Sequence, residues 1–174
     1  MKGKDFMKLS SKEIIDLLHL EPHPTCGLVK QTYLSKTILP KSALPAQFGS
    51  DRPAGSILYF MVTQETQIKL HKIRSDQMYH FYFGTPLEVL LLYPDGNAEI
   101  KVAGDDIKTG MAPQLFIPGN TYHVSRLHEE GSYSLLGTSE WIGVEPEDVK
   151  LGNPEELCNR YPHFKKEIQD FTKK

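Results

Sequence analysis

The sequence predicts an all-β fold, an antiparallel barrel or sandwich with a short helical segment at each end. From Ser56 onward, short apolar runs rich in β-branched and aromatic residues alternate with turn residues at even spacing. No helical pattern of useful length interrupts these runs, which argues against a parallel α/β sheet. The turn Pro94-Asp95-Gly96-Asn97 has the composition of a hairpin. We expect about eight strands here, over residues 56–63, 67–73, 77–83, 86–93, 97–103, 114–118, 121–127 and 132–139.

A short helix is expected at about residues 10–20. Ser10 and Glu13 have the spacing of a capping box, and the apolar residues that follow form a helical stripe. Pro22 and Pro24 end this helix because proline lacks the backbone N–H and restricts the residue before it.

The rest of the chain is expected to add one strand and a helical tail. Residues 26–39 are rich in Val, Ile, Thr and Tyr and predict a further strand. A helical tail is expected at about 153–172, where Pro154 opens the first turn. We therefore expect one domain over 1–174, with the barrel at about 28–145.

Composition excludes several classes of protein. The formal net charge is -2, and the basic residues are scattered, so a nucleic-acid partner is not expected. No apolar run is long enough for a signal peptide or a membrane span, which predicts a cytoplasmic protein without a membrane partner. Cys26 and Cys158 are the two cysteines, which excludes a disulfide framework and a Cys-rich zinc site.

The segment 71–84, HKIRSDQMYHFYFG, is the best candidate for a pocket wall. It mixes ionisable and aromatic residues at strand spacing just before a glycine. Alternation places Gln77, Tyr79 and Phe81 on one face of a strand, so that a polar group stands at the end of an aromatic stripe. His71 lies on an apolar strand just before them.

Together with the segment 110–123, GMAPQLFIPGNTYH, this stretch resembles the two motifs of cupins. The first cupin motif has a pair of His, then a Glu, and a Gly seven residues after the Glu. The second has PxG followed by a His. The corresponding positions in this sequence are His71, Gln77, Gly84, Pro118, Asn120 and His123. The resemblance implies a double-stranded β-helix, an antiparallel jelly-roll barrel.

The sequence also resembles one branch of small, largely uncharacterised cupins with a pattern near HRxxSDExWHFYxGxPL. The similar stretches are SILYFMV, HKIRSDQMYHFYFGTPLEVLLLYPDG and LLGTSEWIGVEPEDVKLG, preceded by IIDLLHLEPHP and CGLVKQTY. Together they span nearly the whole chain. The resemblance implies a homodimer and no settled reaction, and a two-fold sheet extension would also cover exposed β edges.

The departures from the cupin motifs concern metal binding. Ile73 stands at the second His and Gln77 at the Glu, which removes two of the four usual ligands. Neutral amides bind metals weakly, so we expect no cofactor. The open alternative is a weakly held divalent metal at His71, Gln77 and His123.

A small-molecule ligand is expected inside the barrel. Its predicted contacts are His71, Gln77, Tyr79, Phe81 and His123. Whether His80 contacts the ligand is left open, because the family motif retains this residue while strict alternation along the strand turns its side chain to the opposite face. The role of Lys30 and Thr32 is also left open. They either contact the ligand at the barrel mouth or belong to an exposed edge strand. The other histidines, including His23, and the acidic cluster at 145–148 are interpreted as solvated.

Three functions are compatible with these residues. The first is a cupin of unestablished activity that binds a small polar or sugar-like molecule. The second is an isomerase or epimerase acting on a sugar-nucleotide-like substrate, with His71 as the base and Tyr79 or Tyr82 as the acid. The third is a non-catalytic structural or storage cupin. No phosphate-binding or nucleophile-elbow motif is present.

Overall fold

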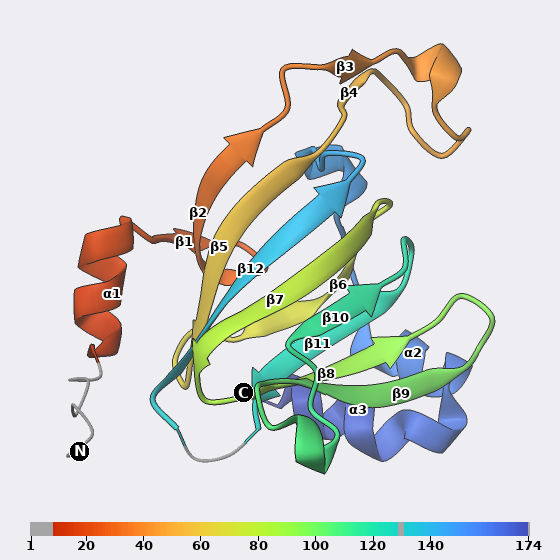
Figure 1. Ribbon diagram of the computed structural model, residues 1–174. Helices are drawn as coiled ribbons and strands as arrows, with labels where there is room; N and C mark the ends of the chain where they lie inside the picture. Colours follow the sequence, from red (N-terminus) through yellow and green to blue (C-terminus); the bar gives the residue numbers. More distant parts are fainter. Residues whose placement is uncertain (1–8, 129–130, 174) are drawn as a thin grey trace.

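The computed structural model describes residues 9–128 and 131–173, so part of the expected domain 1–174 lies outside the described residues. Two antiparallel sheets face each other across a hydrophobic core (Figure 1). The six-stranded sheet has the order β1 (Glu21–His23), β2 (Gly27–Leu34), β5 (Ser56–Thr63), β12 (Tyr133–Trp141), β7 (Asp76–Gly84), β10 (Gln114–Ile117). The five-stranded sheet has the order β13 (Lys150–Leu151), β6 (Ile68–Lys72), β11 (Tyr122–Leu127), β8 (Leu87–Leu92), β9 (Ala98–Ala103). A small sheet pairs β3 (Ile38–Leu39) with β4 (Arg52–Pro53).

The predicted all-β fold class is confirmed, and each of the strands expected after Ser56 is present. Gly96 lies in the hairpin between β8 and β9 with φ of 94°. The strand expected over residues 26–39 is interrupted, because β2 ends at Leu34 and the chain turns away to form β3. The core between the sheets draws residues from both of them, including Phe60, Leu91 and Leu136.

Helices cover the outer face of the five-stranded sheet and part of the outer face of the six-stranded sheet (Figure 1). The helix α1 (Ser11–Leu18) has the expected capping box and packs Ile14 against the six-stranded sheet. The helices α2 (Pro154–Arg160) and α3 (Lys165–Thr172) pack on the five-stranded sheet. Short 3-10 helices are η1 (Lys41–Ala43), η2 (Ile107–Thr109), η3 (Pro146–Asp148) and η4 (Pro162–Phe164). Among the described residues, no helix has the length and apolar character needed to cross a membrane.

Strand register brings the two predicted motifs together. In the pairing of β6 with β11, His71 lies directly opposite His123. In the pairing of β7 with β12, Gln77 lies opposite Glu140. Side chains directly opposite on neighbouring strands are in contact distance, so these pairs define one region of the barrel interior.

Two motif positions need a left-handed backbone. Gly84 has φ of 108°, and a Cβ there would lie 2.5 Å from the backbone oxygen of Tyr133. Asn120 has φ of 64° at the place where the cupin motif has glycine. Asparagine tolerates this conformation better than most residues, so the turn before His123 keeps its shape without glycine.

The Gly84→Ala variant is expected to lower the free energy of unfolding by about 1–3 kcal/mol, because its methyl group overlaps a backbone atom. Urea denaturation measures this change. Gly49→Ala is the matched control, since the nearest atom to its Cβ is 3.8 Å away. A loss no larger than that of the control would contradict the requirement for glycine at 84.

A buried ion network ties the β4 segment to η3. Arg52 is 1% exposed and donates from Nε and Nη2 to the two carboxylate oxygens of Asp148, at 2.8 and 2.9 Å. Arg74 donates to the same carboxylate at 2.9 Å, and Glu147 also contacts Arg52. The interpretation of the acidic cluster as solvated is therefore wrong for Asp148. Its side chain lies inside, where two guanidinium groups compensate its charge.

Candidate functional site

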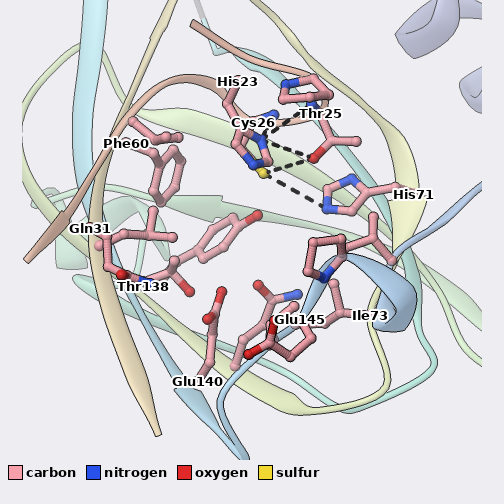
Figure 2. Close-up of a pocket in the computed structure, with 18 residues that line it drawn as sticks. His23, Thr25, Cys26, Gln31, Phe60, His71, Ile73, Thr138, Glu140 and Glu145 are labelled. Carbon is pink, nitrogen blue, oxygen red and sulfur yellow. Dashed lines mark hydrogen bonds between the residues drawn. The ribbon is translucent and has the colours of Figure 1, made fainter. Parts of the chain in front are cut away.

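A cavity of about 450 Å³ opens into the barrel between the two sheets (Figure 2). Its floor consists of buried side chains from β5, β6, β7 and β12. Its rim comes from the segment before β2 and from the segment that follows β12. The lining residues are His23, Pro24, Thr25, Cys26, Val29, Gln31, Leu58, Phe60, His71, Ile73, Gln77, Tyr79, Thr138, Glu140, Val144, Glu145, Pro146 and Val149.

Two neutral imidazoles stand side by side in the barrel. His71 Nδ1 lies 2.7 Å from the Lys69 carbonyl, and His123 Nδ1 lies 3.3 Å from the Thr121 carbonyl. Because a carbonyl only accepts, Nδ1 holds the proton in both rings and each Nε2 presents a lone pair. Burial lowers the pKa of His71 to about 4 and the pKa of His123 well below its usual value. Both rings are therefore uncharged at neutral pH.

Cys26 lies beside His71 at the side of the cavity nearest the N-terminal segment (Figure 2). Its Sγ is 3.9 Å from His71 Nε2 and 3.3 Å from the Thr25 hydroxyl. Burial raises the pKa of the Cys26 thiol to about 11. Since the thiolate is the nucleophile, a neutral thiol of this kind is not an activated one.

Glu140 is the buried acid of the cavity. It is 8% exposed, and the Ser56 hydroxyl donates a hydrogen bond to its Oε2. Burial raises the pKa of Glu140 to about 7, against the opposing effect of that hydrogen bond. The carboxyl group therefore exchanges a proton near neutral pH, which is the range that acid–base chemistry and pH-dependent binding require.

Thr138 lies two residues before Glu140 on the same face of β12. It is 5% exposed, and its hydroxyl has no hydrogen-bond partner among the described residues. Figure 2 shows Thr138 and Glu140 across the cavity from Cys26. Phe60 and Tyr79, with ring centroids 4.7 Å apart, supply an aromatic wall. The lining contains no Lys or Arg.

Residues 12–152 match the model of a family described as "Cupin superfamily (DUF985)". The chain belongs to the cupin superfamily. None of the curated proteins matches it. The predicted cupin fold is thus confirmed by the family match and by the two facing antiparallel sheets.

Solved structures share this cupin fold. A protein from Shewanella oneidensis is 25% identical with a TM-score of 0.82, and 95% of this chain aligns with 99% of that one. A hypothetical protein from Leishmania major is 21% identical with a TM-score of 0.83, over 95% of this chain and 100% of that one. An oxalate decarboxylase from Bacillus subtilis is 13% identical with a TM-score of 0.51, over 92% of this chain and 39% of that one.

The donor groups of this cupin do not suit a tightly bound metal. The His71 and His123 rings have centroids 4.3 Å apart and supply two imidazole donors. The third candidate, Gln77, is a neutral amide whose Nε2 lies 3.4 Å from His123 Nε2. Among residues 9–128 and 131–173, no group of three or more His, Cys, Asp or Glu is arranged to hold a metal ion. Stable sites for zinc and similar metals generally have at least three such ligands.

Treatment with a chelator is expected to leave the thermal midpoint of this cupin unchanged to within about 1 °C, because a metal that binds weakly contributes little to stability. Differential scanning calorimetry before and after EDTA treatment and dialysis measures the midpoint. A decrease that one equivalent of a divalent metal reverses would contradict this prediction.

The structure brings together some of the predicted site residues and separates others. His71, Gln77 and Tyr79 line the cavity, and His123 lies directly behind the first two. The other predicted residues lie outside the lining: Phe81, His80, Lys30 and Thr32.

Each of these four outlying residues has another environment. Phe81 packs against the core and is not part of the cavity lining. His80 hydrogen-bonds Ser139 at 3.0 Å, as strict alternation along β7 predicts. Thr32 donates to the Ile57 carbonyl at 3.1 Å, and Lys30 is exposed. On β2 the alternating face that lines the cavity contains Val29 and Gln31 instead.

Glu140, Thr138 and Cys26 are among the cavity residues that were not predicted from the sequence. The signal for the first two was present in β12, where Leu136, Thr138 and Glu140 alternate on one face of a predicted strand. His23, interpreted as solvated, contributes to the rim and accepts hydrogen bonds from the backbone of Thr25 and Cys26. No local pattern in the sequence indicates these contacts at the N-terminal segment.

Proposed function

We propose that this cupin binds a small polar organic molecule inside the barrel. The observation that supports the proposal is a cavity of about 450 Å³ whose buried floor holds unused hydrogen-bonding groups. The Thr138 hydroxyl has no partner among the described residues, and the lone pair of His71 Nε2 is engaged only by a weak thiol contact at 3.9 Å. Buried polar groups are normally satisfied, and this volume is in the range of ligand sites.

A blocked cavity tests this proposal. The protein is purified under native conditions and analysed by native mass spectrometry, and polar fragments are then screened by ligand-observed NMR. Binding is expected in the wild type and is expected to be lost in Val144→Phe, which places a ring in the lining. Val102→Phe, on β9 outside the lining, is the matched control. Binding that persists in Val144→Phe and disappears in Val102→Phe would refute the assigned site.

The other two functions receive less support from the site. An isomerase with His71 as the base would use an imidazole whose pKa is lowered to about 4, which makes it a weak base. A sugar-nucleotide substrate has a diphosphate, and the lining has no Lys or Arg to neutralise it. A storage role without a ligand would leave the cavity of about 450 Å³ and its polar floor without a use.

We also propose that the protein is a homodimer of the cupin branch with the HRxxSDExWHFYxGxPL-like pattern. Strand register places large exposed side chains on the outer face of the six-stranded sheet beyond α1: Tyr33, Ile57, Tyr82, Phe116 and Trp141. An apolar face of this kind is typical of an interaction surface. Light scattering is expected to give twice the mass of one chain, and Trp141→Glu is expected to reduce it. A single-chain mass at all concentrations would contradict the dimer.

A further inference from the structure

We propose that the ligand of the cavity is an organic amine whose ammonium group forms an ion pair with Glu140. This inference rests on the proposed function and specifies the chemical class of the ligand. The cavity combines a buried acid, other hydrogen-bond acceptors and an apolar aromatic wall, and it lacks a cation of its own.

The charges around the cavity favour a positively charged ligand. Glu140 lies on the floor and Glu145 at the exposed rim, and the lining contains no Lys or Arg. The other buried ionisable groups of the lining are His71 on β6, Tyr79 on β7 and Cys26 just before β2, and burial disfavours the charged form of each. Desolvation also lowers the pKa of His23 at the rim. A carboxylate in this place therefore has no positive partner, and an ammonium ion would supply one.

The hydrogen-bonding groups favour a ligand rich in donors. Glu140 offers carboxylate oxygens, Thr138 offers an unpartnered hydroxyl oxygen, and His71 offers the lone pair of Nε2. Thr138 is the independent observation, because it is the one among the unpartnered buried hydroxyls of the described residues that lines the cavity. An ammonium group has three N–H donors, whereas an alcohol has one.

The remaining wall suits the hydrocarbon part of such a ligand. Phe60 and Tyr79 present aromatic rings to the cavity, and Leu58 and Val29 add aliphatic surface. Aromatic rings also attract cations. The cavity of about 450 Å³ has room for a single ring with a short aminoalkyl chain.

Three probes of the same size test the inference: benzylammonium, benzyl alcohol and benzoate. Isothermal titration calorimetry at about pH 8, where Glu140 is ionised, is expected to give at least ~10-fold tighter binding of benzylammonium than of benzyl alcohol. Benzoate is expected not to bind. Glu140→Gln keeps the size of the side chain and is expected to abolish the preference for the ammonium ion. Glu99→Gln, outside the cavity, is expected to keep it.

The pH dependence supplies a second readout. The affinity for benzylammonium is expected to increase between about pH 5.5 and about pH 8 as Glu140 loses its proton. Protonation of His23 at the acidic end of this range acts in the same direction, whereas His71, with a pKa of about 4, stays neutral. Glu140→Gln is therefore expected to reduce the pH dependence of the affinity and to leave a smaller one.

The outcomes separate this inference from the proposed function. Equal or tighter binding of benzyl alcohol, with no effect of Glu140→Gln, would overturn the inference that the ligand is an amine. The proposal that the cavity binds a ligand would still stand. If benzylammonium fails to bind and polar fragments in the NMR screen also fail, both the inference and the proposed function are overturned.

Discussion

Replacement of Asp148 by Asn lowers the free energy of unfolding by about 3–5 kcal/mol, because it removes the buried counter-charge of Arg52 and, among the described residues, leaves that guanidinium with only the solvent-exposed Glu147 as an ionic partner. Arg52 is 1% exposed and makes a two-point contact with the Asp148 carboxylate, and Arg74 shares the same group. The asparagine amide keeps one acceptor oxygen but cannot accept both bonds from Arg52. The ion network is therefore expected to be the most sensitive polar feature of this protein.

Urea denaturation of Asp148→Asn at neutral pH measures the loss. Lys101→Gln, which removes the exposed pair between Lys101 and Glu99, is the control and is expected to change stability by less than about 1 kcal/mol. Burial acts to raise the pKa of Asp148, but the hydrogen bonds from Arg52 outweigh it and hold the pKa below its usual value. The wild type should therefore lose this contribution only below about pH 4, as the carboxylate becomes protonated. Equal losses in the two variants would contradict the role of the buried network.

Glu140→Gln changes the free energy of unfolding of the ligand-free protein by an amount that depends on pH. The change is expected to be more favourable at about pH 8 than at about pH 5 by about 3 kcal/mol. Burial raises the pKa of Glu140 from 4.5 to about 7. Between these values the unfolded chain has lost the proton while the folded protein keeps it. The folded protein therefore binds more protons, and the contribution of Glu140 to stability declines as pH rises from about 4.5 to about 7. Glutamine does not ionise, so the variant has no such decline.

The neighbouring histidines change the stability with pH in the opposite direction to Glu140. The quantity to measure is therefore the difference in unfolding free energy between the wild type and Glu140→Gln. Burial lowers the pKa of His71 to about 4, and its contribution to stability therefore increases as pH rises from about 4 to about 6.5. His123 acts in the same direction. Because both proteins contain these histidines, the difference in unfolding free energy between wild type and variant isolates Glu140. A difference that does not change between about pH 5 and about pH 8 would contradict the raised pKa.

Most of the fold could be predicted from the sequence because the patterns that indicate its strands and helices are local. Each strand after Ser56 is a short apolar run bounded by turn residues, and the capping box of Ser10 and Glu13 marks α1. The end of β2 at Leu34 was not accessible, since the residues that follow have strand composition but pair with β4 in a separate sheet. That pairing depends on residues more than ten positions away, which local propensity does not describe.

The candidate site was accessible only where a motif defined it. His71, Gln77 and His123 were predicted from the cupin spacing, and strand register places them together. Glu140 on β12 and Cys26 just before β2 are far from the two cupin motifs in the sequence, and their roles depend on burial and on which neighbours lack charge. Phe81 shows a second limit. Alternation correctly predicts that its side chain packs on the core side of the strand, but it does not show that Phe81 stays outside the cavity lining.

The division of the cavity into floor and rim has a consequence for how cupins of this kind diversify. The floor belongs to strands that also form the hydrophobic core, so changes there affect folding and binding together. The rim comes from residues 23–26 and 144–149, which lie outside the long strands (Figure 1). Substitutions at exposed positions of these two segments, such as His23 and Glu145, can therefore alter which molecules enter at little cost to stability, whereas the buried Asp148 cannot be changed in this way. A barrel of this kind can therefore bind new ligands through substitutions in its rim while the residues of its interior stay the same.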